Sequence, residues 1–218
     1  MLGFPQTTEF NKRIPKQKFY ENMDVSPALK RVFVEQIKLI HWRNKISPTT
    51  INIAPGQTVD EIEVIEIKLN QQSLDEAVLR QIDKEVPYHI LFVLSCGNKV
   101  QAWTGYKQAA EGGTKAFKVN KYYHTDWMLA DELILEIEGL NMDAVWNSFI
   151  IQVGGVEIEQ GKSLDEQIEV DDLKAKLKKD IEKIEKQARN EKQPNKKFQL
   201  ASQVKELKKQ LNDLDSLM

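Results

Sequence analysis

The clearest hydrophobic pattern in the chain lies between Glu61 and Ser95, where it predicts a strand, a helix and a second strand. Residues 61–69 alternate polar and apolar side chains, as a half-buried strand does. The next apolar side chains recur at every fourth position and line one face of a helix; they are Leu74, Val78, Ile82 and Val86. Residues 89–94 are nearly all apolar, which is typical of a strand covered on both faces. Elements this close together predict a right-handed crossover between two parallel strands.

Boundary signals and weaker patterns predict the rest of a compact domain over residues 26–158. Ser73 and Glu76 have the spacing of a capping box at the start of the crossover helix. The other expected elements are a helix over 26–46, strands over 49–53, 100–106, 116–123 and 133–137, and a helix over 141–154. The predicted fold class is therefore α/β (α+β), with a mixed sheet built around the crossover.

Residues 163–218 have a different pattern, which predicts two amphipathic helices joined at Pro194. The second helix repeats apolar residues with the alternation of four and three that defines a heptad seam. We expect an antiparallel helical hairpin (coiled coil). One pair of helices of this length is only marginally stable alone, so the hairpin should pack on something else. It is either a docking arm for a partner or a strut that packs on its own domain. The candidate partner-binding residues are Leu173, Leu177, Ile184, Leu200, Val204, Leu207 and Leu211.

Residues 1–25 form a basic and aromatic N-terminal arm, in which Pro5 and Pro15 argue against a continuous helix. Cations can contact phosphate and aromatic rings can stack on bases, so the arm is a candidate DNA contact. The alternative is a solvated arm with a few anchors on the core. The candidate DNA-binding residues, two of them in the following helix, are Lys12, Arg13, Lys16, Lys30 and Arg31.

Composition narrows the class of protein without choosing a function. The 218 residues are 41% hydrophobic, enough for one sizeable core, and the net charge of -2 gives no global attraction to nucleic acid or membrane. The lone Cys96 excludes an internal disulfide and fits no zinc-ligand spacing. No apolar run approaches the roughly 20 residues that span a bilayer. We therefore expect a cytoplasmic protein with no membrane contact.

Glu66 and Lys68 give the strongest enzymatic signal, because alternate residues of a strand point to the same face. They resemble the glutamate-x-lysine element of the PD…(D/E)xK nuclease superfamily, which implies carboxylates that hold Mg²⁺ and a lysine that positions the attacking water. Glu35 is a candidate auxiliary acid. That superfamily has an acid on the preceding strand, however, and this chain has no Asp or Glu between Glu35 and Asp60. We therefore expect no metal site and no cofactor, with Mg²⁺ only under the nuclease alternative.

Several stretches of the chain, taken together, are similar to the bacterial family called domain of unknown function 4391. They read EFNKRIPKQKFYEN, VFVEQIKLIHWRNKI, EIEVIEIKLNQ, VLRQIDKEVPYHILFVL, GLNMDAVW and EKQPNKKFQL. The resemblance covers nearly the whole chain and brings no catalytic residues with it. It implies a cellular context, because members tend to be encoded beside DNA methyltransferases and large helicases of restriction or phage-defence type.

Three hypotheses follow from the sequence. The leading one is a non-catalytic accessory subunit of a helicase–methyltransferase system, which docks through the hairpin and contacts DNA through the basic residues. The second is a Mg²⁺-dependent nuclease that uses Glu66 and Lys68, with Glu35 as the auxiliary acid. The third is a self-associating scaffold, in which the hairpins of a homodimer form a four-helix bundle.

Overall fold

The structure is a computed structural model that describes residues 2–21, 25–109, 117–159 and 161–216. The chain divides into two compact units, Met1–Val156 and Glu157–Met218, and each is described by itself. No helix in these ranges is long and apolar enough to cross a membrane.

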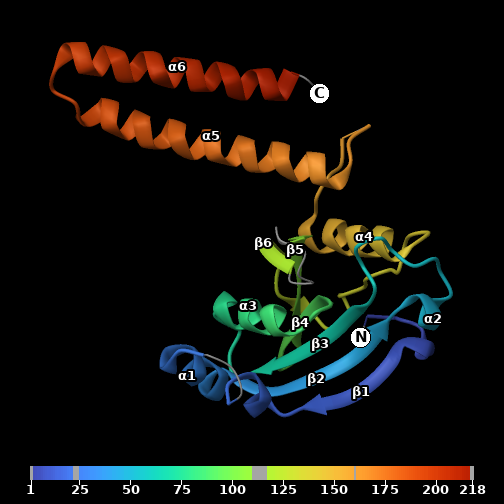
Figure 1. Cartoon of the computed structure of the whole chain (residues 1–218). Helices are drawn as coiled ribbons and strands as arrows, with labels where there is room; N and C mark the ends of the chain where they lie inside the picture. Colours follow the sequence, from blue (N-terminus) through green and yellow to red (C-terminus); the bar gives the residue numbers. More distant parts are fainter. Residues whose placement is uncertain (1, 22–24, 110–116, 160, 217–218) are drawn as a thin grey trace. The chain divides into compact units, whose positions relative to one another are not determined.

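A mixed sheet of seven strands forms the centre of the first unit within the described residues (Figure 1). Six strands follow the order β1-β2-β3-β4-β5-β6, and β7 pairs with β5. The pair β3–β4 is parallel and the other pairs are antiparallel, which confirms the predicted crossover. The strands are β1 (Glu9–Ile14), β2 (Ile37–Ile46), β3 (Ile62–Leu69), β4 (His89–Cys96), β5 (Lys99–Ala109), β6 (Phe117–His124) and β7 (Met128–Leu129).

Helices cover both faces of this sheet. Tyr122 and Tyr123 are neighbours on β6 and therefore point to opposite faces. Tyr122 bonds to Asp83 of α3, whereas the ring of Tyr123 lies against Gly154 of α4. On the α3 face, α1 and α3 bury a core that includes Phe33, Ile40, Ile67, Ile82 and Phe92. The helices of the first unit are α1 (Pro27–Glu35), α2 (Pro48–Ile51), α3 (Glu76–Glu85) and α4 (Met142–Gly154), with short 3-10 turns η1 (Gln6–Thr8) and η2 (Lys16–Phe19).

Asp143 ties the start of α4 to the loop that precedes β3. Its carboxylate accepts hydrogen bonds from the backbone N–H groups of Gln57, Thr58 and Val59 and from the Thr58 hydroxyl. A Cβ atom at Gly56 would come within 2.7 Å of Oδ1 of Asp143, so only glycine fits there. Asn141 caps the same helix by accepting from the Ala144 N–H, as the sequence predicts.

The predicted helix over 26–46 is wrong beyond Glu35. The helix α1 begins as expected, with the Ser26 hydroxyl accepting from the Leu29 N–H, but residues 37–46 form β2. Apolar residues of this segment fit a helical spacing, yet the segment is rich in β-branched and aromatic side chains. Its pairing with β1 on one side and β3 on the other decides the outcome.

Three smaller predictions also need correction. Residues 48–51 form the short helix α2, because Ser47 makes a capping box with Thr50 and Pro48 occupies the first turn, so no strand forms there. Residues 133–137 make only an isolated bridge from Ile134 to Leu2, although alternate side chains are buried as expected. The crossover helix starts at Glu76 with Asp75 as its N-cap, not Ser73.

The second unit is the predicted helical hairpin, formed by α5 (Leu164–Asn190) and α6 (Pro194–Ser216). A capping box between Ser163 and Glu166 starts α5. The two helices pack against each other and bury Leu177 and Ile181 of α5.

Candidate functional site

The carboxylate of Glu66 lies at the centre of the candidate site. Glu66 is on β3, toward the end where β3 and the parallel strand β4 finish, and its side chain is 1% exposed. Arg43 of β2 holds one oxygen with two nitrogens, Nε at 2.8 Å and Nη2 at 2.5 Å. The Ser95 hydroxyl of β4 donates to the other oxygen at 2.7 Å. Three neighbouring strands therefore supply this arrangement, and the buried charge of Glu66 is neutralised by an arginine.

A β-bulge explains how Arg43 reaches Glu66. Trp42 pairs with Ile65 and Asn44 pairs with Val64, so Arg43 is an extra residue with no partner of its own on β3. A bulge re-aims the side chain of the inserted residue. The guanidinium thus lies against Glu66 and holds one of its two oxygens.

Lys68 follows Glu66 on the same face of β3, as the sequence predicts, but contacts it only weakly. Its Nζ atom lies 3.9 Å from Oε1 of Glu66, and its side chain is 41% exposed. An ammonium this exposed contributes little to the stability of the fold. It is therefore available to a ligand.

Two cavities meet at the Arg43–Glu66 pair. One has a volume of about 270 Å³ and a lining that includes Glu9, Asn11 and Asn44. The other has a volume of about 310 Å³ and a lining that includes Lys38, Lys68 and Ser95. Because Arg43 neutralises the one carboxylate in its wall, the second cavity has a net positive lining. Two ammonium groups and a hydroxyl are suited to a phosphate group.

The residues present do not fit a magnesium ion. Both oxygens of Glu66 already accept hydrogen bonds from Arg43 and Ser95. Glu35, the predicted auxiliary acid, is an exposed residue at the end of α1, outside the lining of both cavities. Among the described residues, no three His, Cys, Asp or Glu side chains are grouped so that they could hold a metal ion.

His41 lies on β2 directly opposite Glu66. Burial lowers the pKa of its imidazole, and the cations of Arg43 and Lys68 outweigh Glu66 and lower it further. The Nδ1 atom is buried and has no hydrogen-bond partner among the described residues. We therefore expect a neutral histidine in this position at pH 7.

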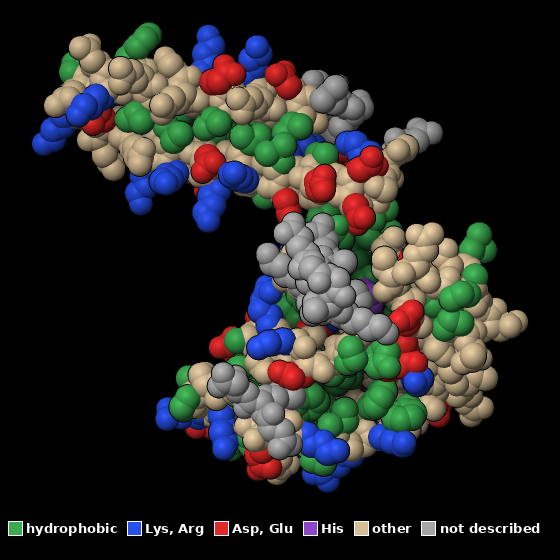
Figure 2. All heavy atoms as spheres, in the orientation of Figure 1, with side chains coloured by type: hydrophobic (Ala, Val, Ile, Leu, Met, Phe, Trp, Pro, Cys, Tyr) green, Lys and Arg blue, Asp and Glu red, His purple; other side chains and the backbone are tan. Residues whose placement is uncertain are grey.

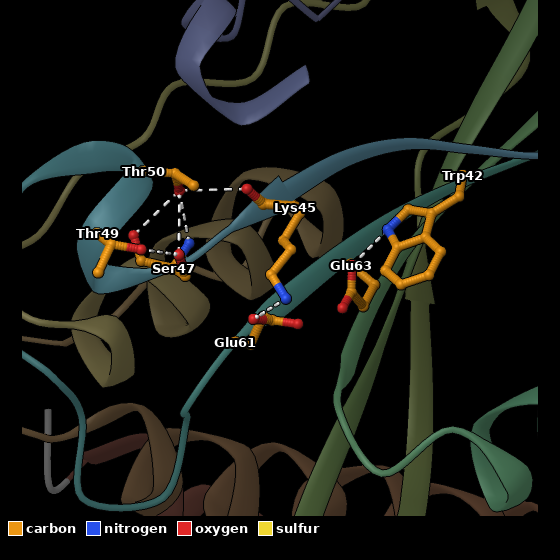
Figure 3. A network of polar contacts seen from close by, with 7 residues as sticks. All are labelled: Trp42, Lys45, Ser47, Thr49, Thr50, Glu61 and Glu63. Atoms are coloured by element: carbon orange, nitrogen blue, oxygen red, sulfur yellow. Dashed lines mark hydrogen bonds and ion pairs between the residues drawn. The ribbon is translucent and has the colours of Figure 1, made fainter. Parts of the chain in front are cut away.

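A second polar cluster lies at the other end of β3 (Figure 3). Lys45 pairs with Glu61 at 2.6 Å, and the Trp42 indole donates to Glu63. Burial, together with the adjacent Glu61 carboxyl, raises the pKa of Glu63 to about 9. We therefore expect Glu63 to be protonated at neutral pH, and with Lys45 paired to Glu61 this cluster carries little net charge.

A third group of buried charges joins α3 to β5 and β6. Lys107 lies 2.7 Å from Oδ1 of Asp83, and the two side chains are 0% and 1% exposed. The Tyr122 hydroxyl also donates to Asp83, and Lys107 donates to the Tyr88 carbonyl at 2.7 Å. Burial lowers the pKa of Lys107 and raises that of Asp83, while their mutual attraction opposes both shifts. The pair joins elements within the fold and has no cavity of its own among the described ones.

The predicted DNA-binding residues differ in their surroundings. Lys16 donates to the carbonyls of Val34 at 3.0 Å and Ile37 at 2.8 Å, so it holds the end of α1. Lys12 lies over the Phe10 ring and Lys30 over the Tyr20 ring, although both residues are exposed. Arg13 and Arg31 are also exposed.

The predicted partner-binding residues of the hairpin differ in exposure. Leu177 is buried, whereas Leu173 is 45% exposed. The other five are half-buried along the line where α5 and α6 meet; they are Ile184, Leu200, Val204, Leu207 and Leu211.

Sequence reasoning found Glu66 and Lys68 but missed Arg43, Ser95 and Lys38. A helix over 26–46, as the sequence predicts, would not pair Lys38 and Arg43 with β3, so neither is expected as a neighbour of Glu66. A strand assignment for this segment, on its β-branched and aromatic content, would have put both beside β3. Ser95 could have been found from the register of the crossover, because Lys68 pairs with Ser95.

Fold and site together define an α+β protein with an arginine-neutralised carboxylate at the end of a parallel strand pair. The chain belongs to the family described as domain of unknown function 4391, whose model matches residues 2–211. The resemblance inferred from the sequence is thereby confirmed. No curated protein and no solved structure matches the chain.

Proposed function

We propose that the protein is a non-catalytic accessory subunit of a bacterial helicase–methyltransferase system of restriction or phage-defence type. The α/β unit contacts nucleic-acid phosphate, and the hairpin is the arm that docks on the partner proteins. The cellular context comes from the family resemblance. The observation that carries the binding role is the cavity lined by Lys38 and Lys68 beside a carboxylate that Arg43 has neutralised.

Binding is favoured over catalysis because the acid of the site is occupied. In a metal-dependent nuclease the carboxylates are free to hold the ion. Here Glu66 accepts from Arg43 and Ser95, which leaves cations as the groups open to a ligand. The test is a DNA cleavage assay with Mg²⁺ on the protein purified with its partners from the native host. Any cleavage should be the same for the wild type and for Glu66→Gln. Cleavage that is lost in Glu66→Gln would support the nuclease alternative.

Oligonucleotide binding tests the phosphate contact. A fluorescent duplex should bind with an affinity that falls as salt rises, because each phosphate contact releases counterions. The double variant Lys38→Gln/Lys68→Gln should weaken binding at least tenfold and reduce the salt slope by about 2. The matched control, Lys18→Gln/Lys84→Gln, removes two exposed lysines outside the cavity lining. Salt-independent binding, or equal losses in both variants, would rule the cavity out.

Co-purification tests the docking role. Deletion of residues 163–218 removes the hairpin and should abolish recovery of the helicase or methyltransferase from the native host. The circular dichroism of the remaining domain should still show a cooperative unfolding transition. If the shortened protein still recovers its partners, the docking surface is on the α/β unit.

A further inference from the structure

Charge is distributed unequally along the hairpin. Its base, residues 164–173 of α5, contains only acidic charges; these are Asp165, Glu166, Glu169, Asp171 and Asp172. Its tip, residues 183–197, has two acids, Glu185 and Glu191, and an excess of cations; these are Lys183, Lys186, Arg189, Lys192, Lys196 and Lys197. Lys174, Lys176, Lys178 and Lys179 follow the base directly, so the hairpin is negative at its base and carries an excess of cations from there to the tip.

The base and the tip cannot neutralise each other within one hairpin. The 27 residues of α5 span about 40 Å at 1.5 Å per residue, several times the screening length of about 8 Å at physiological salt. Within the tip, Glu185 pairs with Arg189 and with Lys208 of α6. Lys192, Lys196 and Lys197 are exposed around the turn, so the tip keeps its positive charge.

The seam between the two helices is open on one face. Figure 2 shows hydrophobic side chains in a line between α5 and α6, with charged side chains on the outer sides of the hairpin. Ile184, Leu200, Val204 and Leu207 are only half-buried, and Leu173 is 45% exposed. Near the tip, a groove of about 750 Å³ is lined mostly by polar residues, which include Lys183, Lys186 and Lys196, with Leu200 as its apolar residue. Two helices bury only part of each other's apolar stripe, whereas four helices can enclose it.

We propose that this open face binds the same face of a second copy of the chain, with the two hairpins antiparallel. In that arrangement the positive tip of each copy lies beside the negative base of the other, and the seams meet in a four-helix bundle. A two-fold axis places the same residues in both halves, so both charge contacts form together. The inference rests on the proposed function only in taking the hairpin as the interaction arm.

A second copy fits the charge pattern better than a nucleic acid does. A polyanion would be attracted to the tip but repelled by the base, and it would leave the apolar seam uncovered. A second hairpin is complementary to the tip, the base and the seam at once. Electrostatic complementarity of this kind fixes orientation as well as association.

The mass of the full chain in solution is the first test. Sedimentation equilibrium at micromolar concentrations should give twice 25.2 kDa. Charge reversal at the tip (Lys192→Glu, Lys196→Glu and Lys197→Glu) should raise the dimer dissociation constant at least tenfold. Reversal at the base (Glu169→Lys, Asp171→Lys and Asp172→Lys) should do the same.

Mixing the two reversed variants is the decisive test. The tip-reversed protein is negative at both ends and the base-reversed protein is positive at both, so an equimolar mixture should recover the dimer. A control with the same change of net charge, Lys18→Glu, Lys30→Glu and Lys84→Glu, alters exposed lysines of the α/β unit and should remain dimeric. Circular dichroism checks that each variant keeps its helices.

Three outcomes would overturn the proposal: a monomeric wild-type protein with an intact hairpin, a mixture that stays monomeric, or a control that also dissociates. A monomer whose tip reversal abolishes oligonucleotide binding would identify the tip as a nucleic-acid contact instead.

Helicase recovery is measured on the same variants. If recovery persists in dissociated variants, the docking proposal stands without the dimer; if deletion of the hairpin leaves recovery unchanged, the docking proposal fails whatever the mass.

Discussion

Glu66 and Arg43 show how one inserted residue changes what a familiar pair of residues can do. The glutamate-x-lysine spacing on β3 is compatible with a metal-dependent site. The bulge in β2 instead directs a guanidinium at the carboxylate and supplies the positive charge that a metal ion would otherwise provide. The chemistry of the site is thus decided by a residue more than twenty positions away in the sequence.

Replacement of Arg43 tests this dependence. Arg43→Ala leaves a buried carboxylate without its partner, so we expect the free energy of unfolding to fall by about 3 kcal/mol. Urea denaturation at neutral pH measures this change. The double variant Arg43→Met/Glu66→Leu should recover most of the loss, because no buried charge remains. Arg13→Ala, at an exposed arginine of β1, serves as control; equal effects at both positions would contradict the role of Arg43.

Glu63 gives a second prediction at this scale, one of pH dependence. The carboxyl has a pKa of about 9 in the native protein against an ordinary 4.5. Between these values the native state keeps a proton that the unfolded chain releases, so stability falls as pH rises through this window.

Glu63→Gln keeps an uncharged side chain that can still accept from Trp42. The variant should be more stable than wild type at about pH 8.5, by roughly 1–2 kcal/mol after allowance for solvent screening, with little difference near pH 4. Thermal denaturation over this range of pH measures it. Parallel pH profiles for the two proteins would show that Glu63 is ionised in the native state.

At the scale of elements, the sequence predicts a segment correctly where its hydrophobic spacing and its residue types favour the same structure. Where the two favour different structures, the prediction is wrong. The crossover has alternation, helical spacing and an apolar run in order, and β3, α3 and β4 form as expected. In residues 37–46 the spacing of the apolar residues favours a helix while the residue types favour a strand. The choice depends on β1 and β3, which lie on either side in space, and no local pattern contains that information.

The same difference between segments explains which residues of the candidate site could be predicted. Glu66 and Lys68 were found because both belong to the well-patterned strand β3. Arg43 and Lys38 were missed because they belong to β2, and the bulge that aims Arg43 has no signature in a single sequence. Lys16, a predicted DNA contact, donates from its ammonium group to two carbonyls near the end of α1, and no sequence pattern indicates these bonds.

Asp143 carries the prediction at this scale, since it joins α4 to a loop far away in sequence. Burial tends to raise the pKa of its carboxyl, but hydrogen bonds from Gln57, Thr58 and Val59 outweigh burial and hold it below the ordinary value. Its contribution to stability is thus present above the unfolded pKa of 3.8 and lost as pH falls through the lower native value.

Asp143→Asn should therefore lower the free energy of unfolding by about 1–2 kcal/mol at neutral pH, because charge-assisted bonds become neutral ones. The difference from wild type should shrink as the pH falls below about 4. Denaturant titrations at neutral and acidic pH check both statements, with the exposed Asp131→Asn as control. A constant difference at all pH values would mean that the carboxylate charge is not what matters.

For the whole molecule, the division into two units leads us to expect two separate unfolding events. The first unit has a buried core between sheet and helices, whereas the hairpin buries only one seam. We expect the hairpin to melt first, seen as a loss of helical signal, and the α/β unit at a higher temperature.

Concentration dependence distinguishes a paired hairpin from an isolated one. If two copies associate, the lower transition should move upward as protein concentration rises, while the upper one stays fixed. Calorimetry over a hundredfold range of concentration measures both. A single transition, or two that ignore concentration, would contradict this arrangement.

The enclosed ammonium group of Lys107 has a practical consequence. Reagents that acylate lysine need a deprotonated amine in contact with solvent, and this one is 0% exposed in the folded protein. Exposed lysines should therefore react within minutes, whereas Lys107 should react only after β5 has separated from α3. The rate at which peptide mass spectrometry detects acylated Lys107 would therefore report how often the α/β unit opens.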